Sequence, residues 1–413
     1  MGPQPVKLAY FVHDLTDPAV ARRLRMLKAG GAEPVVLGFR REATAPATVE
    51  GVRAVDLGRT YDARMAQRAA MTALAAVGAG RLREHLRGAQ VIVARTLEML
   101  AVAEAARLMA GSNARLVYEC LDIHRLMLGQ GAKSRTLRAA ERALMRRADL
   151  LAVSSPAFLD AYFGPMQGVG TELRIPTILI ENKVLELEAQ ADAPLPGIAA
   201  GPPWTIAWMG AIRCRKSLAM LTDLAARRPD LVAVRIHGRP AYTEFDDFDS
   251  QVARLPNLTF GGAYTPADLP RLYGEAHFAW AIDFMEEGLN SSWLLPNRLY
   301  EASRHGASPI ALAGVQTGRY LAEHGFGLRI GAPQDLEAVL EAMTAARYLA
   351  LRQEVAQVPR KAFVADTDDC RALVAVLAGE APIDAASPAS RKAARNRAVK
   401  GAFPSEHIRG EAV

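Results

Sequence analysis

The stretch PNRLYEASRHGASPIAL, residues 296–312, carries polar side chains whose spacing suits a binding site. Its leading proline favours the start of a helix, and Asn297 and Glu301 then lie on one face of that helix. A carboxylate near the positive end of a helix should be ionised, so Glu301 can accept hydrogen bonds from both hydroxyls of a ribose. Arg298 lies beside it, and Gly306 ends the helix before the apolar run SPIAL. This pattern predicts recognition of a ribose-bearing ligand.

A second segment, WMGAIRCRKSLAML at residues 208–221, joins a predicted strand to a predicted helix. The strand ends at Gly210, which lets a ligand approach the backbone, and the helix begins near Ser217. Three basic residues lie in the connection: Arg213, Arg215 and Lys216. The free N–H groups and partial positive charge at a helix start, with arginine and lysine beside them, favour a diphosphate. An ordinary strand-to-helix turn with surface basic residues explains this segment alone equally well.

Two further strands in this half of the chain end in polar residues. IHGRPA (236–241) ends one strand with His237, Gly238 and Arg239, although glycine at a strand end is also a common turn residue. HFAWAI (277–282) forms the other strand, and the loop behind it contains four polar residues: Asp283, Glu286, Glu287 and Asn290. Because the carboxyl ends of parallel strands meet at one edge of a sheet, these residues should face the same cleft.

Candidate acid and base groups follow two strands in the first half of the chain, in HDLTD (13–17) and YECLDIH (118–124). The candidates in chain order are His13, Asp14, Asp17, Glu119, Asp122 and His124. A general base must be a titratable side chain within reach of the proton it removes, and a strand-end loop provides that position. We favour Asp122 together with His124. For His13, an orienting, hydrogen-bonded histidine is an equally good explanation.

Short apolar runs alternate with helical patterns along both halves of the chain. In the first half, strands are expected over 7–12, 33–39, 52–58, 91–95, 115–120, 150–155 and 177–182. In the second half they are expected over 204–210, 231–238, 257–262, 277–282 and 308–312. Helices are expected between them, including 62–87, 97–110, 134–147 and 266–275. Apolar strands separated by helices are typical of parallel sheets covered on both faces.

The expected fold class is therefore α/β, with two doubly wound, Rossmann-like domains that face each other across a cleft. We expect the first domain over residues 1–195 and the second over 203–375, with a linker rich in proline and glycine at 193–204. Residues 380–413 read as a mobile tail. The tail is basic at Arg391, Lys392, Arg395, Arg397 and Lys400.

Composition excludes several classes of protein. A chain of 413 residues is long enough for about two domains. Its three cysteines lack a CxxC spacing, which argues against a disulfide framework or a zinc knuckle and for a reducing, cytoplasmic compartment. The start lacks the features of a signal peptide, and no stretch approaches the roughly 20 apolar residues of a membrane helix, so membrane contact should be peripheral. The net charge of +6 suits phosphate-bearing ligands, anionic lipid or nucleic acid without choosing among them.

Three further features have competing structural explanations. The helix expected over 134–147 places several arginines beside Leu137 and Leu144, which suits either an anionic leaflet or packing on the sheet. The basic tail suits membrane or nucleic-acid contact, but inert disorder is the favoured hypothesis. DFD (247–249) and DTD (366–368) match a manganese-binding D-x-D pattern, yet each lies where aspartates cap a helix. We therefore predict no metal and no cofactor.

In this combination of motifs the chain resembles the donor half of GT-B glycosyltransferases, family 4 in particular. The resemblance rests on G-x-x-R-x-x-K at 210–216, on ADLPRLYGEAHFAW at 267–280 and on the stretch at 296–312. Within that family the chain is most similar to the bacterial exopolysaccharide enzymes of the succinoglycan type. Their first half is matched by YFVHDLTDPAVARRLRMLKAGGAEPVVLGF, YECLDIH, SSPAFLDAYF and IENKV. The resemblance covers about residues 6–375.

The resemblance implies a role for each matching residue. Arg213 and Lys216 would hold the diphosphate of a nucleotide sugar, a UDP- or GDP-sugar, and Glu301 would bind its ribose. Asn297 and Arg298 would lie beside the phosphates and the sugar. The base or ribose would be contacted from the segment His237, Gly238 and Arg239.

One position departs from the family pattern. Family members commonly carry two glutamates eight positions apart, the first of which contacts the donor sugar, but the position eight before Glu301 is Trp293. The retaining mechanism usual in the family is therefore not implied for this chain. If the reaction inverts the sugar, a base on the first domain must take the proton of the acceptor hydroxyl. If it retains, no base is required, and His124 would contact the donor sugar.

The resemblance implies transfer of a hexose from a nucleotide diphosphate sugar to a saccharide acceptor bound by the first domain. It also implies a polyprenyl-diphosphate-linked acceptor at the inner face of the plasma membrane, in exopolysaccharide or cell-surface polysaccharide synthesis. Nucleic acid is not an expected partner. Two alternatives stay open: a nucleotide-sugar 2-epimerase of similar fold, and a degenerate transferase that binds a nucleotide sugar or a partner without turnover.

Overall fold

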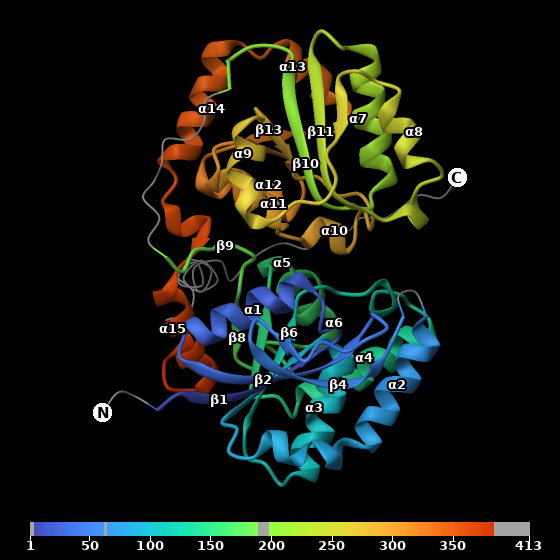
Figure 1. The fold of residues 1–413 in the computed structure, drawn as a ribbon, viewed down its shortest axis with the longest axis vertical. Helices are drawn as coiled ribbons and strands as arrows, with labels where there is room; N and C mark the ends of the chain where they lie inside the picture. The colour runs from blue at the N-terminus through green and yellow to red at the C-terminus, as the bar shows by residue number, and fades with distance from the viewer. Residues whose placement is uncertain (1–3, 62–63, 189–197, 384–413) are drawn as a thin grey trace.

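Apolar strands form two separate parallel sheets, one in each half of the chain, as the sequence pattern predicts (Figure 1). The computed structural model describes residues 4–61, 64–188 and 198–383. The first sheet has the order β3-β4-β2-β1-β5-β6-β7-β8, and its described pairs are parallel except β3 with β4. Its strands are β1 (Val6–Val12), β2 (Ala32–Arg40), β3 (Thr48–Val49), β4 (Val52–Arg59), β5 (Val91–Arg95), β6 (Arg115–Cys120), β7 (Leu150–Val153) and β8 (Thr177–Leu179).

The second sheet is parallel throughout its described pairs and has the order β12-β11-β10-β13-β14-β15. Numbered from its first strand this is the doubly wound order 3-2-1-4-5-6, which places a switch point between β10 and β13. Its strands are β10 (Trp204–Ile212), β11 (Val232–Pro240), β12 (Leu258–Phe260), β13 (Phe278–Trp280), β14 (Ser308–Leu312) and β15 (Leu328–Ile330). The predicted α/β class with two Rossmann-like sheets is confirmed.

Helices cover both sheets. In the first half they are α1 (Pro18–Ala29), α2 (Met65–Val77), α3 (Leu97–Met109), α4 (Ala132–Met145), α5 (Pro156–Phe158) and α6 (Gly164–Gln167). In the second half they are α7 (Arg215–Arg227), α8 (Phe248–Ala253), α9 (Leu269–Gly274), α10 (Asn290–Trp293), α11 (Asn297–Arg304), α12 (Gln316–His324), α13 (Asp335–Glu341) and α14 (Ala345–Gln357). The single helix expected over 62–87 is instead α2 followed by a 3₁₀ segment, Ala79–Leu86, because Gly78 and Gly80 weaken the α-helix there.

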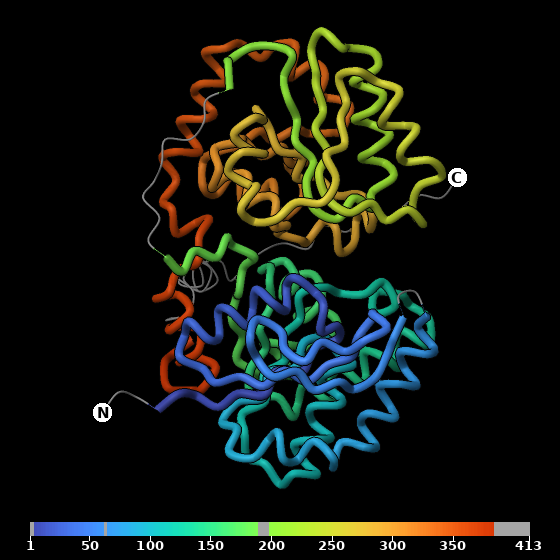
Figure 2. The backbone as a smooth tube through the Cα atoms, in the orientation of Figure 1, coloured from blue at the N-terminus to red at the C-terminus, as the bar shows by residue number. Residues whose placement is uncertain are grey.

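The end of the chain returns to the first domain. Strand β16 (Val364–Ala365) pairs with β9 (Val184–Leu185), and α15 (Thr367–Ala378) then packs against α1 and the first sheet, as Figure 2 shows by the red segment beside the blue one. Gly30 permits this contact, because a Cβ there would lie 2.3 Å from the Cys370 carbonyl oxygen. Helix α15 therefore belongs to the first core, although its residues fall mostly inside the range expected for the second domain. The tail from residue 384 lies outside the described residues, as does linker segment 193–197.

Helix α4 uses its leucines for packing. Leu137 and Leu144 lie against the core of the first domain, and its exposed side chains are mainly alanine and basic residues. The helix therefore lacks the large apolar face that insertion into a leaflet requires. No helix in the described part of the chain is long and apolar enough to cross a membrane.

A buried ionic network holds the end of β6. The Glu119 carboxylate, 1% exposed, accepts hydrogen bonds from Tyr10 Oη at 2.6 Å and from Arg23 Nε at 2.7 Å. Arg95 Nη1 donates to the same tyrosine oxygen at 3.0 Å. Burial opposes ionisation, but Arg23 and Arg95 keep the pKa of Glu119 below its ordinary value. Glu119, one of the acid/base candidates, is thus a fully engaged structural carboxylate.

Candidate functional site

The turn after β10 carries the basic residues that the sequence singles out. Helix α7 begins at Arg215, two residues before the expected start at Ser217, so Lys216 lies in its first turn. Cys214 caps this helix, since its Sγ accepts hydrogen bonds from Ser217 N and from Phe284 N, both at 3.4 Å. The cap ties the turn after β10 to the loop after β13. The basic turn is therefore fixed at the switch point of the second sheet.

Two glycines bring neighbouring strands unusually close at this edge. Gly210 and Gly238 are register partners on β10 and β11, with φ angles of +108° and +140°. A Cβ at Gly238 would lie 1.8 Å from the Gly210 carbonyl oxygen, whereas a Cβ at Gly210 would meet nothing within 4 Å. Gly238 is therefore required by the fold. The space over Gly210 is consistent with the close approach expected of a ligand.

Asp283 connects two of the predicted donor residues. Its Oδ2 lies 3.8 Å from Arg213 Nη2 and 3.9 Å from Arg298 Nη2, and its side chain is 9% exposed. Arg298 Nη1 is buried and has no hydrogen-bond partner among the described residues. A buried guanidinium N–H that lacks an acceptor is costly, so an anionic ligand at this point would be stabilised.

Lys216 has a carboxylate partner of its own. Its Nζ lies 2.6 Å from Glu287 Oε2 and 4.4 Å from the centre of the Phe284 ring. Both Lys216 and Glu287 are about half exposed, so this ion pair is weak. A diphosphate could replace Glu287 as the partner of the lysine at little cost.

Glu301 differs from the expectation that it is ionised. Burial raises its pKa to about 7, although Arg22 and Arg298 both act to lower it. The side chain lies on the second turn of α11 and is only partly exposed, and loss of water there outweighs the partial charge at the start of the helix. Glu301 therefore takes up a proton at a higher pH than an ordinary glutamate does. The pKa of the neighbouring Tyr264 is raised mainly by burial, and the negative charge of ionised Glu301 raises it further.

The remaining donor candidates lie further apart. The ring of His237 packs against Gly261, where a Cβ would lie 2.0 Å from its Cε1, and burial lowers the pKa of the imidazole, with Arg271 and Arg235 contributing. Arg239 and Asn297 are exposed. These three residues border the same sheet edge but are not part of the cluster around Asp283.

Asp122 reaches the second domain from the loop after β6. Asn290 Nδ2 donates a hydrogen bond to Asp122 Oδ1, and Arg213 lies near enough to act on its charge. Loss of water nevertheless raises the pKa of Asp122 above its ordinary value. Glu286 also lies nearby, and its pKa is raised by burial and by the charge of Asp122. The carboxyl edges of the two sheets therefore meet at Asp122.

His124, the other residue of the favoured pair, uses one ring nitrogen in a hydrogen bond with the local backbone. Its Nδ1 accepts a hydrogen bond from Leu126 N at 3.2 Å and caps the 3₁₀ turn Arg125–Met127. Burial lowers the pKa of His124, helped by Arg68 and opposed by Asp122. No hydrogen bond joins the two residues of the pair in the described structure, although they lie close enough to interact electrostatically.

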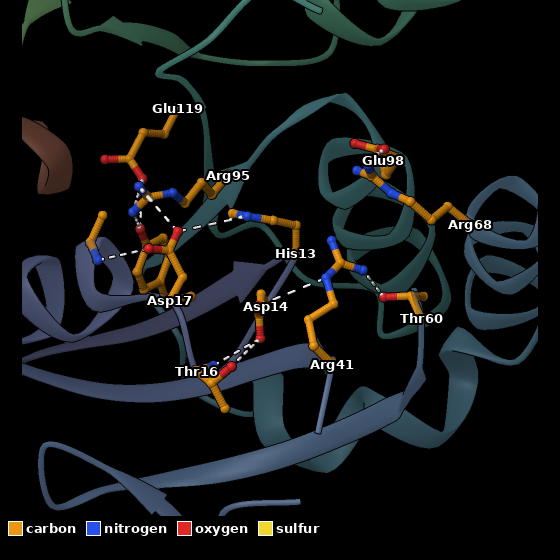
Figure 3. Close-up of polar contacts among 12 residues, drawn as sticks. His13, Asp14, Thr16, Asp17, Arg41, Thr60, Arg68, Arg95, Glu98 and Glu119 are labelled. Atoms are coloured by element: carbon orange, nitrogen blue, oxygen red, sulfur yellow. Dashed lines mark hydrogen bonds and ion pairs between the residues drawn. The ribbon is translucent and has the colours of Figure 1, made fainter. Parts of the chain in front are cut away.

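His13 and Asp14 form a separate cluster in the first domain (Figure 3). His13 Nε2 lies 3.7 Å from Asp17 Oδ2, which lies 3.8 Å from Arg95 Nη2. Asp14 Oδ2 lies 3.8 Å from Arg41 Nε. Burial lowers the pKa of His13, and Asp17 only partly offsets this. The distance from Asp17 is too long for a hydrogen bond, and His13 Nδ1 is buried without a hydrogen-bond partner among the described residues, so the expected hydrogen-bonded, orienting histidine is not observed.

Several residues of the site were not predicted to take part. Glu98, at the start of α3, acts electrostatically on both His13 and His124 and lies 2.6 Å from Arg68 Nη2. Arg22 of α1 acts on Glu301 from the opposite domain. Nothing in the local sequence marks these residues, because each acquires its role by contact with a distant segment. Asn290 had a weak signal, as part of the polar loop after β13.

The two D-x-D matches are helix caps. Asp247 accepts a hydrogen bond from Ser250 N at 3.2 Å, at the start of α8. Asp366 accepts from Asp368 N at 2.9 Å and from Asp369 N at 3.0 Å, at the start of α15. Within the described ranges, no group of three histidine, cysteine or acidic side chains is arranged to hold a metal ion.

Sequence comparison identifies a close relative. The chain is 46% identical over 380 residues to the succinoglycan biosynthesis protein ExoL of Rhizobium meliloti (strain 1021). The match covers 90% of this chain and 93% of that protein. No protein-family profile matches the chain.

Solved structures share the fold at low sequence identity. Sucrose-phosphate synthase from Thermosynechococcus elongatus is 16% identical with a TM-score of 0.62, over 95% of this chain and 100% of that one. Anabaena HepE in complex with UDP is 15% identical with a TM-score of 0.58, over 94% and 100%. The lipopolysaccharide outer core galactosyltransferase WaaB is 11% identical with a TM-score of 0.58, over 86% and 96%. These likenesses show the fold of the chain.

The close strand approach predicts a strong effect of one methyl group. Gly238→Ala should destabilise the second domain by about 2 kcal/mol or more, because the new Cβ collides with the Gly210 carbonyl in a left-handed backbone. Gly314→Ala is the matched control, since a Cβ there meets nothing within 4 Å, and it should change stability by less than about 0.5 kcal/mol. Denaturant unfolding followed by tryptophan fluorescence measures both. Equal midpoints for the two variants would contradict the close contact.

Proposed function

Because this chain belongs to the glycosyltransferase family of the succinoglycan biosynthesis protein ExoL and has the GT-B fold, we propose that it transfers a hexose from a nucleotide diphosphate sugar to a saccharide acceptor. The observation that carries the proposal is the cluster of Arg213 and Arg298 around Asp283, at the switch point of the second sheet and opposite Asp122 of the first domain. In this proposal the arginines bind the diphosphate leaving group, and Asp122 lies where the attacking acceptor hydroxyl would bind.

The second domain is proposed to bind the donor. Arg213, Arg298 and Lys216 bind the diphosphate, and Arg298 supplies a buried N–H that finds no acceptor within the described ranges of the chain. Charge develops on the diphosphate as its bond to the sugar breaks, and fixed cations there stabilise the transition state more than the ground state. Binding of UDP by HepE, which has the same fold, supports a UDP-sugar as the donor.

The first domain is proposed to bind the acceptor. Asp122 takes the proton of the acceptor hydroxyl as that oxygen attacks the anomeric carbon, and the nucleoside diphosphate leaves with the bonding electrons. The raised pKa of Asp122 makes it a stronger base than an ordinary aspartate. His124 lies on the same loop and is proposed to contact the sugars. His13 and Asp14 are proposed to shape the acceptor side of the cleft rather than to transfer protons.

The reaction is proposed to need no metal ion. This is supported by the chemistry of the site, where arginine and lysine face the expected diphosphate, and by the use of both D-x-D segments as helix caps. The acceptor is proposed to be a polyprenyl-diphosphate-linked saccharide in exopolysaccharide synthesis, which would place the enzyme in peripheral contact with the cytoplasmic face of the membrane. The name of the ExoL relative supports the polysaccharide product.

Incubation with a panel of UDP- and GDP-sugars, in buffer containing EDTA, tests the proposal. Release of nucleoside diphosphate that depends on a saccharide acceptor is the expected result. Formation of an epimerised nucleotide sugar would instead establish the 2-epimerase. Tight binding of a nucleotide sugar without turnover, with native and lipid-linked acceptors supplied, would establish the non-catalytic alternative.

The two domains should separate binding from turnover. Lys216→Ala should raise the KM for the donor by roughly tenfold with a smaller effect on kcat, because it removes one phosphate contact. Asp122→Asn should lower kcat by about a hundredfold or more with little change in donor affinity, because it removes the base. Arg215 lies on the first turn of the same helix and forms an exposed ion pair with Asp246. Arg215→Ala, which breaks this pair, is the matched control. Equal losses of donor affinity at Lys216 and Asp122 would refute this division.

Donor affinity should rise with pH through the titration of Glu301. Only the ionised carboxylate accepts both ribose hydroxyls well, and its pKa lies at about 7, so the affinity for UDP-glucose should increase roughly fivefold to tenfold from pH 6 to pH 8. Glu301→Gln should bind more weakly at pH 8 and lose this dependence. Calorimetric titration at several pH values measures the effect. A flat profile for the wild-type protein would show that Glu301 does not bind the ribose in this way.

A further inference from the structure

Helix α10 bridges the two domains, although it belongs to the second. Asn290 at its start is 3% exposed, and both ends of its side-chain amide contact one loop of the first domain. Its Oδ1 accepts a hydrogen bond from Ile123 N at 3.2 Å, and its Nδ2 donates to Asp122 Oδ1. At the other end of the helix, the Trp293 carbonyl accepts a hydrogen bond from Ser155 Oγ.

The paired contacts fix both the amide and the carboxylate. The Ile123 N–H can bond only to the carbonyl side of the amide, which leaves the NH₂ side directed at Asp122. Asn290 Nδ2 engages Asp122 Oδ1, and the Ile123 backbone N–H also acts on this carboxylate, so both contacts hold it in one orientation. The orientation of a first-domain carboxylate is thus set by a side chain of the donor domain. The Asp122 and Asn290 positions are brought together only when the two domains are in contact at α10.

We propose that Asn290 is a positioning residue, which orients Asp122 for proton transfer only while the donor domain is closed against the first domain. The inference rests on the proposed function, and in particular on Asp122 as the base. This role would couple donor binding to placement of the base, because a donor bound between Arg213 and Arg298 lies on the same domain that carries Asn290. The base is therefore in place when a donor is held in the closed cleft, which limits transfer of the sugar to water.

Substitution of Asn290 should lower turnover without weakening the donor site. In Asn290→Ala, kcat for acceptor-dependent transfer should fall by about tenfold to a hundredfold, since a misplaced base is strongly penalised, while the donor KM changes less than about twofold. Asn290→Asp keeps an acceptor for Ile123 N but places a carboxylate against Asp122. The acid limb of its kcat profile should therefore move to higher pH. Besides residue 290, the charged groups facing Asp122 are Arg213, Glu286 and His124.

Ser292→Ala is the matched control within α10, because its Oγ accepts a hydrogen bond from Gly288 N inside the same loop. It should retain the wild-type kcat and pH profile. A double-mutant cycle then shows whether Asn290 acts through Asp122: Asn290→Ala should cost nothing further in the Asp122→Asn background. An additional loss there, of the size seen in the wild type, would overturn the inference.

Failure of the positioning role can be distinguished from failure of the proposed function by measuring wild-type transfer and the UDP affinity of each variant in the same experiment. If the wild type transfers sugar but Asn290→Ala and Asn290→Asp keep its kcat and pH profile, the positioning role is wrong and the proposed function stands. If the wild type transfers no sugar to any acceptor, the proposed function itself fails. Unchanged UDP affinity in both Asn290 variants confirms a folded donor domain, so a loss of kcat then reports on the base. A loss of UDP affinity equal to the loss of kcat would show a purely structural role and overturn the inference.

Discussion

Parallel strand pairing under helices on both faces constrains where polar chemistry can appear in this protein. Strands buried on both sides must be apolar almost to their last residue, and each chain segment leaves the sheet at the same edge. Arg213, Asp283 and Asp122 all follow the carboxyl ends of such strands, and Gly210 lies within the last three residues of β10. The two sheets turn these edges toward each other, and contacts such as Asn290 with Asp122 join them. The site thus follows from the position of the strand ends.

Charge balance is the second constraint on the site. The cations that we propose to bind a diphosphate lie close to one another, and Asp283 and Glu287 offset the charge of Arg213, Arg298 and Lys216. The compensation is incomplete, because Arg298 Nη1 has no hydrogen-bond acceptor among the residues that the structure describes. The two carboxylates hold the cations in position, and one guanidinium N–H is left that an anionic ligand could bind. The elevated pKa of Glu301 shows a similar balance for an acidic group, because its burial is not fully offset by Arg22 and Arg298.

Sequence reasoning was reliable where local pattern decides structure. Each expected strand is present within about three residues of its predicted ends, and so is the helix at 297–304, because apolar runs, caps and glycines within a short window decide them. The short strands β3, β9, β15 and β16 were not predicted, and β10 continues to Ile212, two residues beyond the expected end at Gly210. Sequence reasoning was wrong where the outcome depends on distant segments. The ionisation of Glu301 depends on its burial in the folded chain, and the return of α15 depends on contact with α1. The contact of Asn290 with Asp122, across 168 positions of the chain, was not predicted. Glycines at 78 and 80 were a local signal, and the long helix expected over 62–87 should have been divided there.

Trp293 explains why this chain departs from the two-glutamate pattern at that position. Its side chain packs against the core of the first domain and its carbonyl accepts a hydrogen bond from Ser155, so the segment that would otherwise offer a carboxylate to the sugar is an interdomain contact. A glutamate there would place a charge against apolar side chains without a partner. The carboxylate that the same loop does direct toward Asp122 is Glu286, half-buried and with a raised pKa.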